Sequence, residues 1–224
     1  MKGPAALQAG TITVSGHGWA EGPPDLAAVT LGVECRNSSV DAAFSAAGAS
    51  LAAVSAALRR AGVPDGDLQS TGLTVRADLV WRDGGGQQVA GYIAAGTLAA
   101  RLRDLQSVPA VLSAAIEAGG DDIRLHSLQL AVADPAALRN RAQAAAWEDA
   151  VRSASQFAAL AGATLGRVVT VLEQPTAGGP VPMAGLQRTS SAEGMPLEAG
   201  SCREEAAVTV CWELAQSAQG AWRP

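Results

Sequence analysis

Two hydrophobic periods alternate along this chain, and their order restricts the fold more than any other feature. Apolar residues recur at every second position in 11–15, 26–35, 68–81, 89–102, 123–132, 168–172 and 207–214, as in strands with one buried face. In 38–61, 108–119 and 135–161 they recur at three- and four-residue steps, as in amphipathic helices. This order predicts an α+β fold: a mainly antiparallel sheet with two shorter helices, one long helix and two β-α-β-like modules.

The stretch Gly16-His17-Gly18 lies between the first two predicted strands, and Pro23-Pro24-Asp25 follows it. Glycine and proline in this density are typical of a turn, so the strands 11–15 and 26–35 are expected to form an antiparallel pair. His17 is interpreted as a polar turn residue. A metal site needs three or four ligands, and the only other histidine, His126, lies within the predicted strand 123–132. No metal and no cofactor are expected.

The long helix is expected to begin at Asp134-Pro135, with a capping carboxylate followed by proline in the first turn. Its expected buried row consists of Trp147, Ala150, Ala154, Phe157 and Ala161. Two helix-turn-strand stretches, "ALRRAGVPDGDLQSTGLTV" and "AAIEAGGDDIRLHSLQLAV", are also alike. Duplication of a module and a shared way of ending a helix before a strand both explain that likeness, and both stay open.

Acidic residues are the other groups able to perform chemistry. Most lie at helix-to-strand turns, where acids are common, and the pair at 204–205 is expected on a solvated strand edge: Asp65, Asp67, Asp121, Asp122, Glu204 and Glu205. The chain contains no G-x-S-x-G elbow and no G-K-[ST] phosphate loop. No catalytic residues are assigned, and the protein is expected to be non-catalytic. A small-molecule hydrolase, which would need two acids converging in a pocket, is the less favoured alternative.

Charge and hydropathy limit the partners and the compartment. The net charge is −5, with 16 basic residues against 21 acidic ones, which argues against nucleic acid. No apolar run approaches the roughly 20 residues that span a bilayer, so no membrane-spanning segment is expected. The start "MKGPAALQAG" lacks the apolar region of a signal peptide. A cytoplasmic protein is therefore expected, and a periplasmic or secreted one is the alternative if a leader has been removed.

The three cysteines show no metal-binding spacing and are expected to be reduced and structural. Cys35 continues the buried face of the strand 26–35. Pairing of Cys202 with Cys211 stays open.

The strands 68–81 and 89–102, joined by "RDGGGQQ", predict a long β-ribbon with Trp81 near its tip and Tyr92 on the return strand. Because exposed strand edges are normally covered or paired, we expect the chain to form a homo-oligomer through Trp81 and Tyr92. The alternative is a module in which 175–201, a Pro/Gly/Ser-rich flexible loop, binds a ligand or an unidentified protein partner. The residues proposed for that contact are Met183, Leu186, Met195 and Leu197.

Several of these segments together resemble the SIMPL-domain family, which includes periplasmic and outer-membrane-associated immunogenic proteins. They are "ITVSGHG", "PPDLAAVTLGV", "LRRAGVPDGDLQSTGLTV", "GYIAAGTLAARLRDL", "VLSAAIEAGGDDI", the long helix, "PLEAG" and "AAVTVCWEL". The resemblance covers 10–214 as one domain, with tails at 1–9 and 215–224. It implies an α+β fold, ring- or barrel-like homo-oligomers and a connection to the envelope and oxidative stress. It implies no established catalytic residues.

Overall fold

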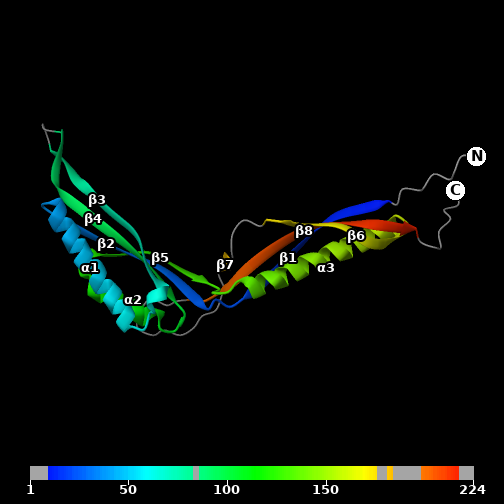
Figure 1. Ribbon diagram of the computed structural model, residues 1–224, viewed down its shortest axis with the longest axis horizontal. Helices are drawn as coiled ribbons and strands as arrows, with labels where there is room; N and C mark the ends of the chain where they lie inside the picture. Colours follow the sequence, from blue (N-terminus) through cyan, green and yellow to red (C-terminus); the bar gives the residue numbers. More distant parts are fainter. Residues whose placement is uncertain (1–9, 83–85, 176–180, 184–197, 217–224) are drawn as a thin grey trace, which may run out of the picture. The chain divides into compact units, whose positions relative to one another are not determined.

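The computed structural model describes residues 10–82, 86–175, 181–183 and 198–216. Within these residues the chain forms two compact units, each built around one antiparallel sheet (Figure 1). Unit 1 contains the chain up to Gly22, Asp134–Met183 and the chain from Ser201, and the helices and strands of unit 2 lie in Pro23–Ala133. The predicted α+β class and its mainly antiparallel sheets are confirmed. The boundaries of a single domain at 10 and 214 stay a prediction.

Unit 2 packs two helices on a sheet with the strand order β3-β4-β2-β5. Its strands are β2 (Leu26–Asn37), β3 (Leu68–Arg82), β4 (Gly86–Leu102) and β5 (Ile123–Ala131). Its helices are α1 (Val40–Arg60) and α2 (Val108–Gly119), and the short turns η1 (Asp65–Asp67) and η2 (Gly120–Asp122) lead into β3 and β5. The two similar sequence stretches therefore both fold as helix, 3₁₀ turn and strand. The core is aliphatic, with Val29, Leu31, Val33, Val54 and Leu58 almost fully buried.

Helix α1 begins where Ser39 accepts a hydrogen bond from the N–H of Ala42, at 3.2 Å. This helix is long and apolar enough to cross a bilayer by length and composition, contrary to the expectation from the sequence. One face of this helix packs on unit 2, where Ala43, Ala47 and Val54 are buried in the core cluster, and 22% of its most apolar stretch is buried.

Unit 1 packs one helix on a second sheet. The strands are β1 (Thr11–Gly22), β6 (Ala163–Gln174), β7 (Val181–Met183) and β8 (Ser201–Gln216), and the helix is α3 (Ala136–Leu160). The sheet order is β1-β8-β6, and β7 also pairs with β8. Helix α3 lies mainly over β1 and β8. Val210 and Trp212 of β8 meet Ala150 and Ala154 of α3 in the core of this unit.

The predicted turn at Gly16-His17-Gly18 is wrong. Strand β1 continues through these residues, with His17 opposite Ala207 of β8, whereas β2 pairs with β4 and β5. The glycines are needed because α3 lies directly on them. A Cβ atom at Gly16 would lie 2.2 Å from the carbonyl oxygen of Ala146, and one at Gly18 would lie 2.2 Å from the nitrogen of the same residue.

The buried face of α3 also differs from the predicted row. Small residues at four-residue steps face the sheet, and these are Ala142, Ala146, Ala150, Ala154 and Ala158. Trp147 and Phe157 are 38% and 55% exposed, because their side chains are too large for the close approach of helix to strand. The predicted role of Asp134 is confirmed, since its carboxylate accepts a hydrogen bond from the N–H of Ala136 at 3.0 Å.

Side chains of α3 also cover the outer edge of β1. The N–H of His17 donates to Oδ2 of Asp149 at 3.0 Å, and the guanidinium of Arg141 donates to the carbonyl oxygen of Glu21. Polar contacts within the unit therefore occupy the edge of the sheet at His17 and Glu21.

Candidate functional site

Neither histidine lies in a reactive arrangement. The side chain of His17 is exposed, and only its backbone N–H has a defined role, on Asp149. This hydrogen bond from His17 is the main cause that lowers the pKa of Asp149. His126 is the extra residue of a bulge in β5, and its ring lies over Gly32, where an added Cβ would be 2.2 Å from Nε2. No group of three potential metal ligands occurs among the residues with described positions.

The acids at the helix-to-strand turns of unit 2 hold the turns together. Asp67 is almost buried and accepts two hydrogen bonds from Arg103, at 2.9 and 3.0 Å. These bonds lower the pKa of Asp67. Asp122 accepts a hydrogen bond from the thiol of Cys35 at 3.1 Å. Burial, and then this bond, raises the pKa of Cys35 to about 11, so the thiol stays protonated and unreactive at neutral pH.

Two cavities lined by described residues of unit 2 each contain one carboxylate. A cavity of about 510 Å³ between the ends of α1 and α2 contains Glu117 as its one carboxylate, beside Arg60. A cavity of about 310 Å³ near the start of α2 contains Asp104 as its one carboxylate. Neither cavity therefore offers the acid pair that the hydrolase alternative requires.

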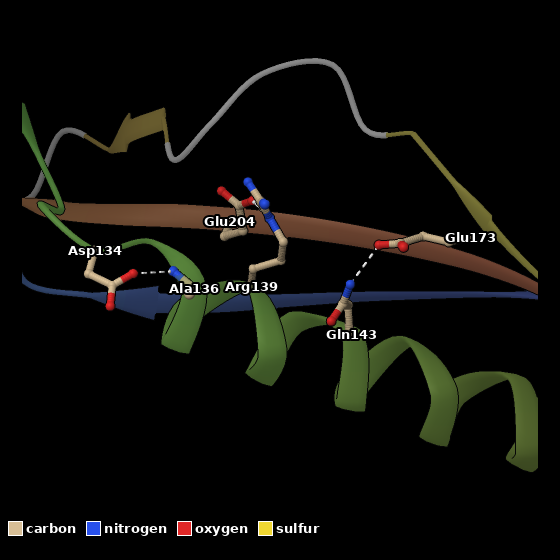
Figure 2. A network of polar contacts seen from close by, with 6 residues as sticks. All are labelled: Asp134, Ala136, Arg139, Gln143, Glu173 and Glu204. Atoms are coloured by element: carbon tan, nitrogen blue, oxygen red, sulfur yellow. Dashed lines mark hydrogen bonds and ion pairs between the residues drawn. The ribbon is translucent and has the colours of Figure 1, made fainter.

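A polar network follows one side of α3 in unit 1 (Figure 2). Glu204 was expected on a solvated edge, but its side chain points toward α3 and is only 3% exposed. Nε of Arg139 donates to one of its carboxylate oxygens at 3.2 Å, and the other oxygen has no hydrogen-bond partner among the described residues. Farther along the helix, Nε2 of Gln143 donates to Oε1 of Glu173 at 2.6 Å, which joins α3 to β6. Alternation along β8 could have indicated that Glu204 faces the helix.

An apolar hollow of about 210 Å³ lies beside this network, between α3, β6 and β8. We call it the α3–β6 groove; it is lined by Gln143, Ala146, Trp147, Val171, Glu173, Ala206, Ala207 and Val208. The ring of Trp147 is supported by Trp212, with ring centroids 6.0 Å apart and planes tilted by 51°. The groove therefore has an aromatic wall supported by a second ring, with polar groups at Gln143 and Glu173.

A second apolar surface lies on β3 of unit 2. Side chains at alternate positions form what we call the β3 row: Leu73, Val75, Leu79 and Trp81, which are 56%, 40%, 50% and 76% exposed. Leu73 and Val75 are opposite Gly96 and Ala94 of β4, on the face that α1 covers at β4. The β3 row thus continues the core face of the sheet beyond the cover of the helix.

The two residues proposed for oligomer contacts differ in exposure. Trp81 lies one residue before the end of β3 and is the more exposed. Tyr92 is half-buried and packs against the core of unit 2.

The residues proposed for the partner-binding loop lie almost entirely outside the described part of the chain. Met183 ends the short strand β7, where it is opposite Ser201 of β8. Leu186, Met195 and Leu197 lie outside the described residues.

A disulfide between Cys202 and Cys211 within one chain is excluded by their positions on β8. An extended strand rises about 3.3 Å per residue, so the two residues are about 30 Å apart. Their odd spacing also places their side chains on opposite faces of the sheet.

Comparison with known proteins gives one consistent result. The family described as SIMPL, protein of unknown function (DUF541), matches residues 12–212. The 26 kDa periplasmic immunogenic protein of Brucella melitensis is 30% identical over 219 residues, which cover 92% of this chain and 86% of that protein. The uncharacterized protein YggE of Escherichia coli (strain K12) is 30% identical over 199 residues, which cover 88% of this chain and 78% of that protein.

Proposed function

Because this chain belongs to the SIMPL family, we propose that it is a non-catalytic periplasmic protein that works as a homo-oligomer assembled through its β3–β4 ribbon. The observation that carries the proposal is the β3 row. These four apolar side chains lie on the core face of their sheet, yet they stay in contact with solvent.

The energetics favour a partner for this surface. Fully burying a Val or Leu side chain is worth about 1.5–3 kcal/mol, and tryptophan is among the residues that most often anchor interfaces. Among the described strands, none pairs with the outer edge of β3. A strand edge with exposed apolar side chains is prone to pair with another chain, in contrast to the edge of β1, which α3 covers.

The chemistry of the described residues supports a role without catalysis. Asp67, Asp122 and Asp149 each have a structural partner, and Cys35 is held in its protonated form. The two cavities described in unit 2 each contain a single carboxylate. This pattern fits a scaffold better than it fits the small-molecule hydrolase.

The periplasmic location rests on the names of relatives in Brucella melitensis and Brucella abortus. The cytoplasmic location expected from the first ten residues has no support from these relatives. Fractionation of cells that express the gene from its native start tests the location, and recovery in the cytoplasm alone would contradict it. A role in oxidative stress stays a prediction, to be tested by survival of a deletion strain in peroxide.

The assembly is tested by size-exclusion chromatography with light scattering. The wild-type protein should elute at a multiple of 22.5 kDa, and Trp81→Ala should shift it toward the monomer. Leu160→Ala is the matched control, because Leu160 is 77% exposed but lies at the end of α3 in unit 1. A wild-type monomer at micromolar concentration, or an unchanged mass for Trp81→Ala, would refute the proposal.

A further inference from the structure

We propose that the α3–β6 groove of one copy receives Trp81 from the β3–β4 ribbon of the next copy. This inference rests on the proposed function and names the surface that the ribbon binds. The interface is then head-to-tail, with a different surface contributed by each copy.

The groove exists because α3 is placed off-centre on its sheet. Gly16 and Gly18 allow the helix to lie directly on β1, and it covers β8 as well. Strand β6 consequently keeps exposed apolar side chains on its helix-facing side at Val168 and Val171, which are 40% and 51% exposed. No charged side chain occurs in residues 168–172. This part of unit 1 is thus an uncharged surface without a cover among the described residues.

The size of the groove favours one side chain over a small molecule. Sites for drug-sized ligands and cofactors are about 300–1,000 Å³, and this groove is about 210 Å³. A single anchor residue inserted into a small apolar pocket is the usual form of an interface hot spot, and tryptophan is prominent among such anchors. At 76%, Trp81 is the most exposed aromatic residue of the described chain.

The chemistry of the groove also suits an indole. Its wall is the ring of Trp147, held in position by Trp212, and aromatic pairs contribute about 0.5–1.5 kcal/mol beyond the buried area. The indole N–H is a donor without acceptor capacity, and the exposed carboxylate of Glu173 is an acceptor in the lining. Val171, Ala206 and Val208 supply the apolar contact.

The strand edges beside these two features are compatible with each other. No described strand pairs with the outer edge of β6, and the same holds for the outer edge of β3. Addition of one strand to the edge of another sheet is a common mode of recognition. The segments that would meet, Leu79–Trp81 and Val168–Val171, contain no charged residues. A β3 strand of one copy can therefore extend the sheet of unit 1 in the next copy, with Trp81 beside the groove.

A head-to-tail contact uses two surfaces on every copy, so it can be tested by complementation. Trp81→Ala removes the anchor but keeps the groove, and Val171→Arg places a charge in the groove but keeps the anchor. Val171 is half exposed, so the arginine should be tolerated by the fold, which circular dichroism checks. Leu172→Arg is the matched control, because Leu172 is the adjacent residue and points to the opposite face of β6.

We expect Trp81→Ala and Val171→Arg each to be monomeric, and Leu172→Arg to keep the wild-type mass. An equimolar mixture of the two monomeric variants should form a dimer of twice 22.5 kDa, because one intact anchor and one intact groove remain. If Trp81→Ala is monomeric but Val171→Arg keeps the wild-type mass, this inference fails and the ribbon-based assembly stands. The same conclusion follows if both variants are monomeric and their equimolar mixture also stays monomeric. If Trp81→Ala keeps the wild-type mass, both proposals fail.

Discussion

Alanine at Gly16 or Gly18 should destabilise the protein, although alanine is normally the better residue in a strand. Glycine in a strand interior costs roughly 0.5–1 kcal/mol relative to alanine, so without a close neighbour either substitution would be stabilising. In this structure the new methyl group would lie 2.2 Å from a backbone atom of Ala146 at both positions. The sign of the change in the free energy of unfolding therefore reports directly on the helix–strand contact.

The magnitude follows from the atoms that would have to move. Ordinary Cβ contacts begin at 3.4 Å, so α3 must shift away from β1 by about 1 Å, and its backbone cannot rotate aside as a side chain could. Overpacking of this kind costs about 1–3 kcal/mol, and we expect the upper end of that range because backbone atoms are involved. The shift would also loosen the contacts of Ala150 and Ala154 with the sheet.

Urea denaturation followed by tryptophan fluorescence measures this effect, because buried Trp212 and its neighbour Trp147 both report on unit 1. The control is Gly48→Ala in α1, where an added Cβ meets nothing within 4 Å. That helix substitution should stabilise unit 2 by up to about 1 kcal/mol, as judged by the same denaturation followed by circular dichroism. If Gly18→Ala proves as stable as the wild type or more stable, the close approach of α3 to β1 is not a feature of the folded protein.

Three further predictions concern single side chains. At pH 8 a soluble disulfide reagent should modify only Cys211 quickly, because it is partly exposed while the other two cysteines are buried; rapid modification of Cys35 would contradict its raised pKa. Arg139→Ala should destabilise unit 1 by about 1–3 kcal/mol, because it leaves the buried carboxylate of Glu204 without its cation. The loss of stability should be smaller in a Glu204→Gln background, and equal losses in the two backgrounds, measured by urea titration, would show that the pair is not coupled. Because the pKa of Asp149 is lowered in the folded protein, this group contributes stability that is present above its unfolded pKa of about 3.9 and is lost as the pH falls through the folded value. Asp149→Asn should therefore be less stable than the wild type at pH 7 and should lose less stability than the wild type between pH 5 and 2. Identical profiles of stability against pH for the two proteins would refute this.

Much of the fold was predictable because alternation and helical periodicity depend on burial alone. The alternation of Val29, Leu31, Val33 and Cys35 predicted a strand with one buried face, and all four are buried. The ribbon of β3 and β4, the position of α2 and the capping carboxylate of Asp134 were predicted on similar local grounds. Local patterns are sufficient where neighbouring residues determine the structure.

Predictions failed where a residue's role depends on a distant segment. Glycine serves tight turns and close packing alike, so Gly16 and Gly18 could not be interpreted correctly without the alanines of α3 that face them. The same limitation placed Trp147 in the predicted buried row, because helical spacing alone does not show that the strand below leaves room only for small side chains. A matched pattern of glycines on a strand and alanines every four residues on a helix was the signal that could have placed both.

Of the two candidate surfaces, one was predictable from a local pattern and the other depends on contacts between distant segments. The exposure of Trp81 followed from its place near the tip of a predicted hairpin. The α3–β6 groove combines residues from α3, β6 and β8, and no local pattern indicates which side of the sheet a helix leaves uncovered.

The pairing of β1 with β8 also determines when this protein can finish folding. His17 of β1 can pair only after Ala207 of β8 has been synthesised. At synthesis rates of about 5–20 residues per second, the ribosome needs roughly 10–40 seconds to make the chain between these two residues. The strands and helices of unit 2 are all complete by residue 131, so that unit can form its core while translation continues. Strand β1 therefore cannot join its sheet until β8, the last described strand, has been synthesised.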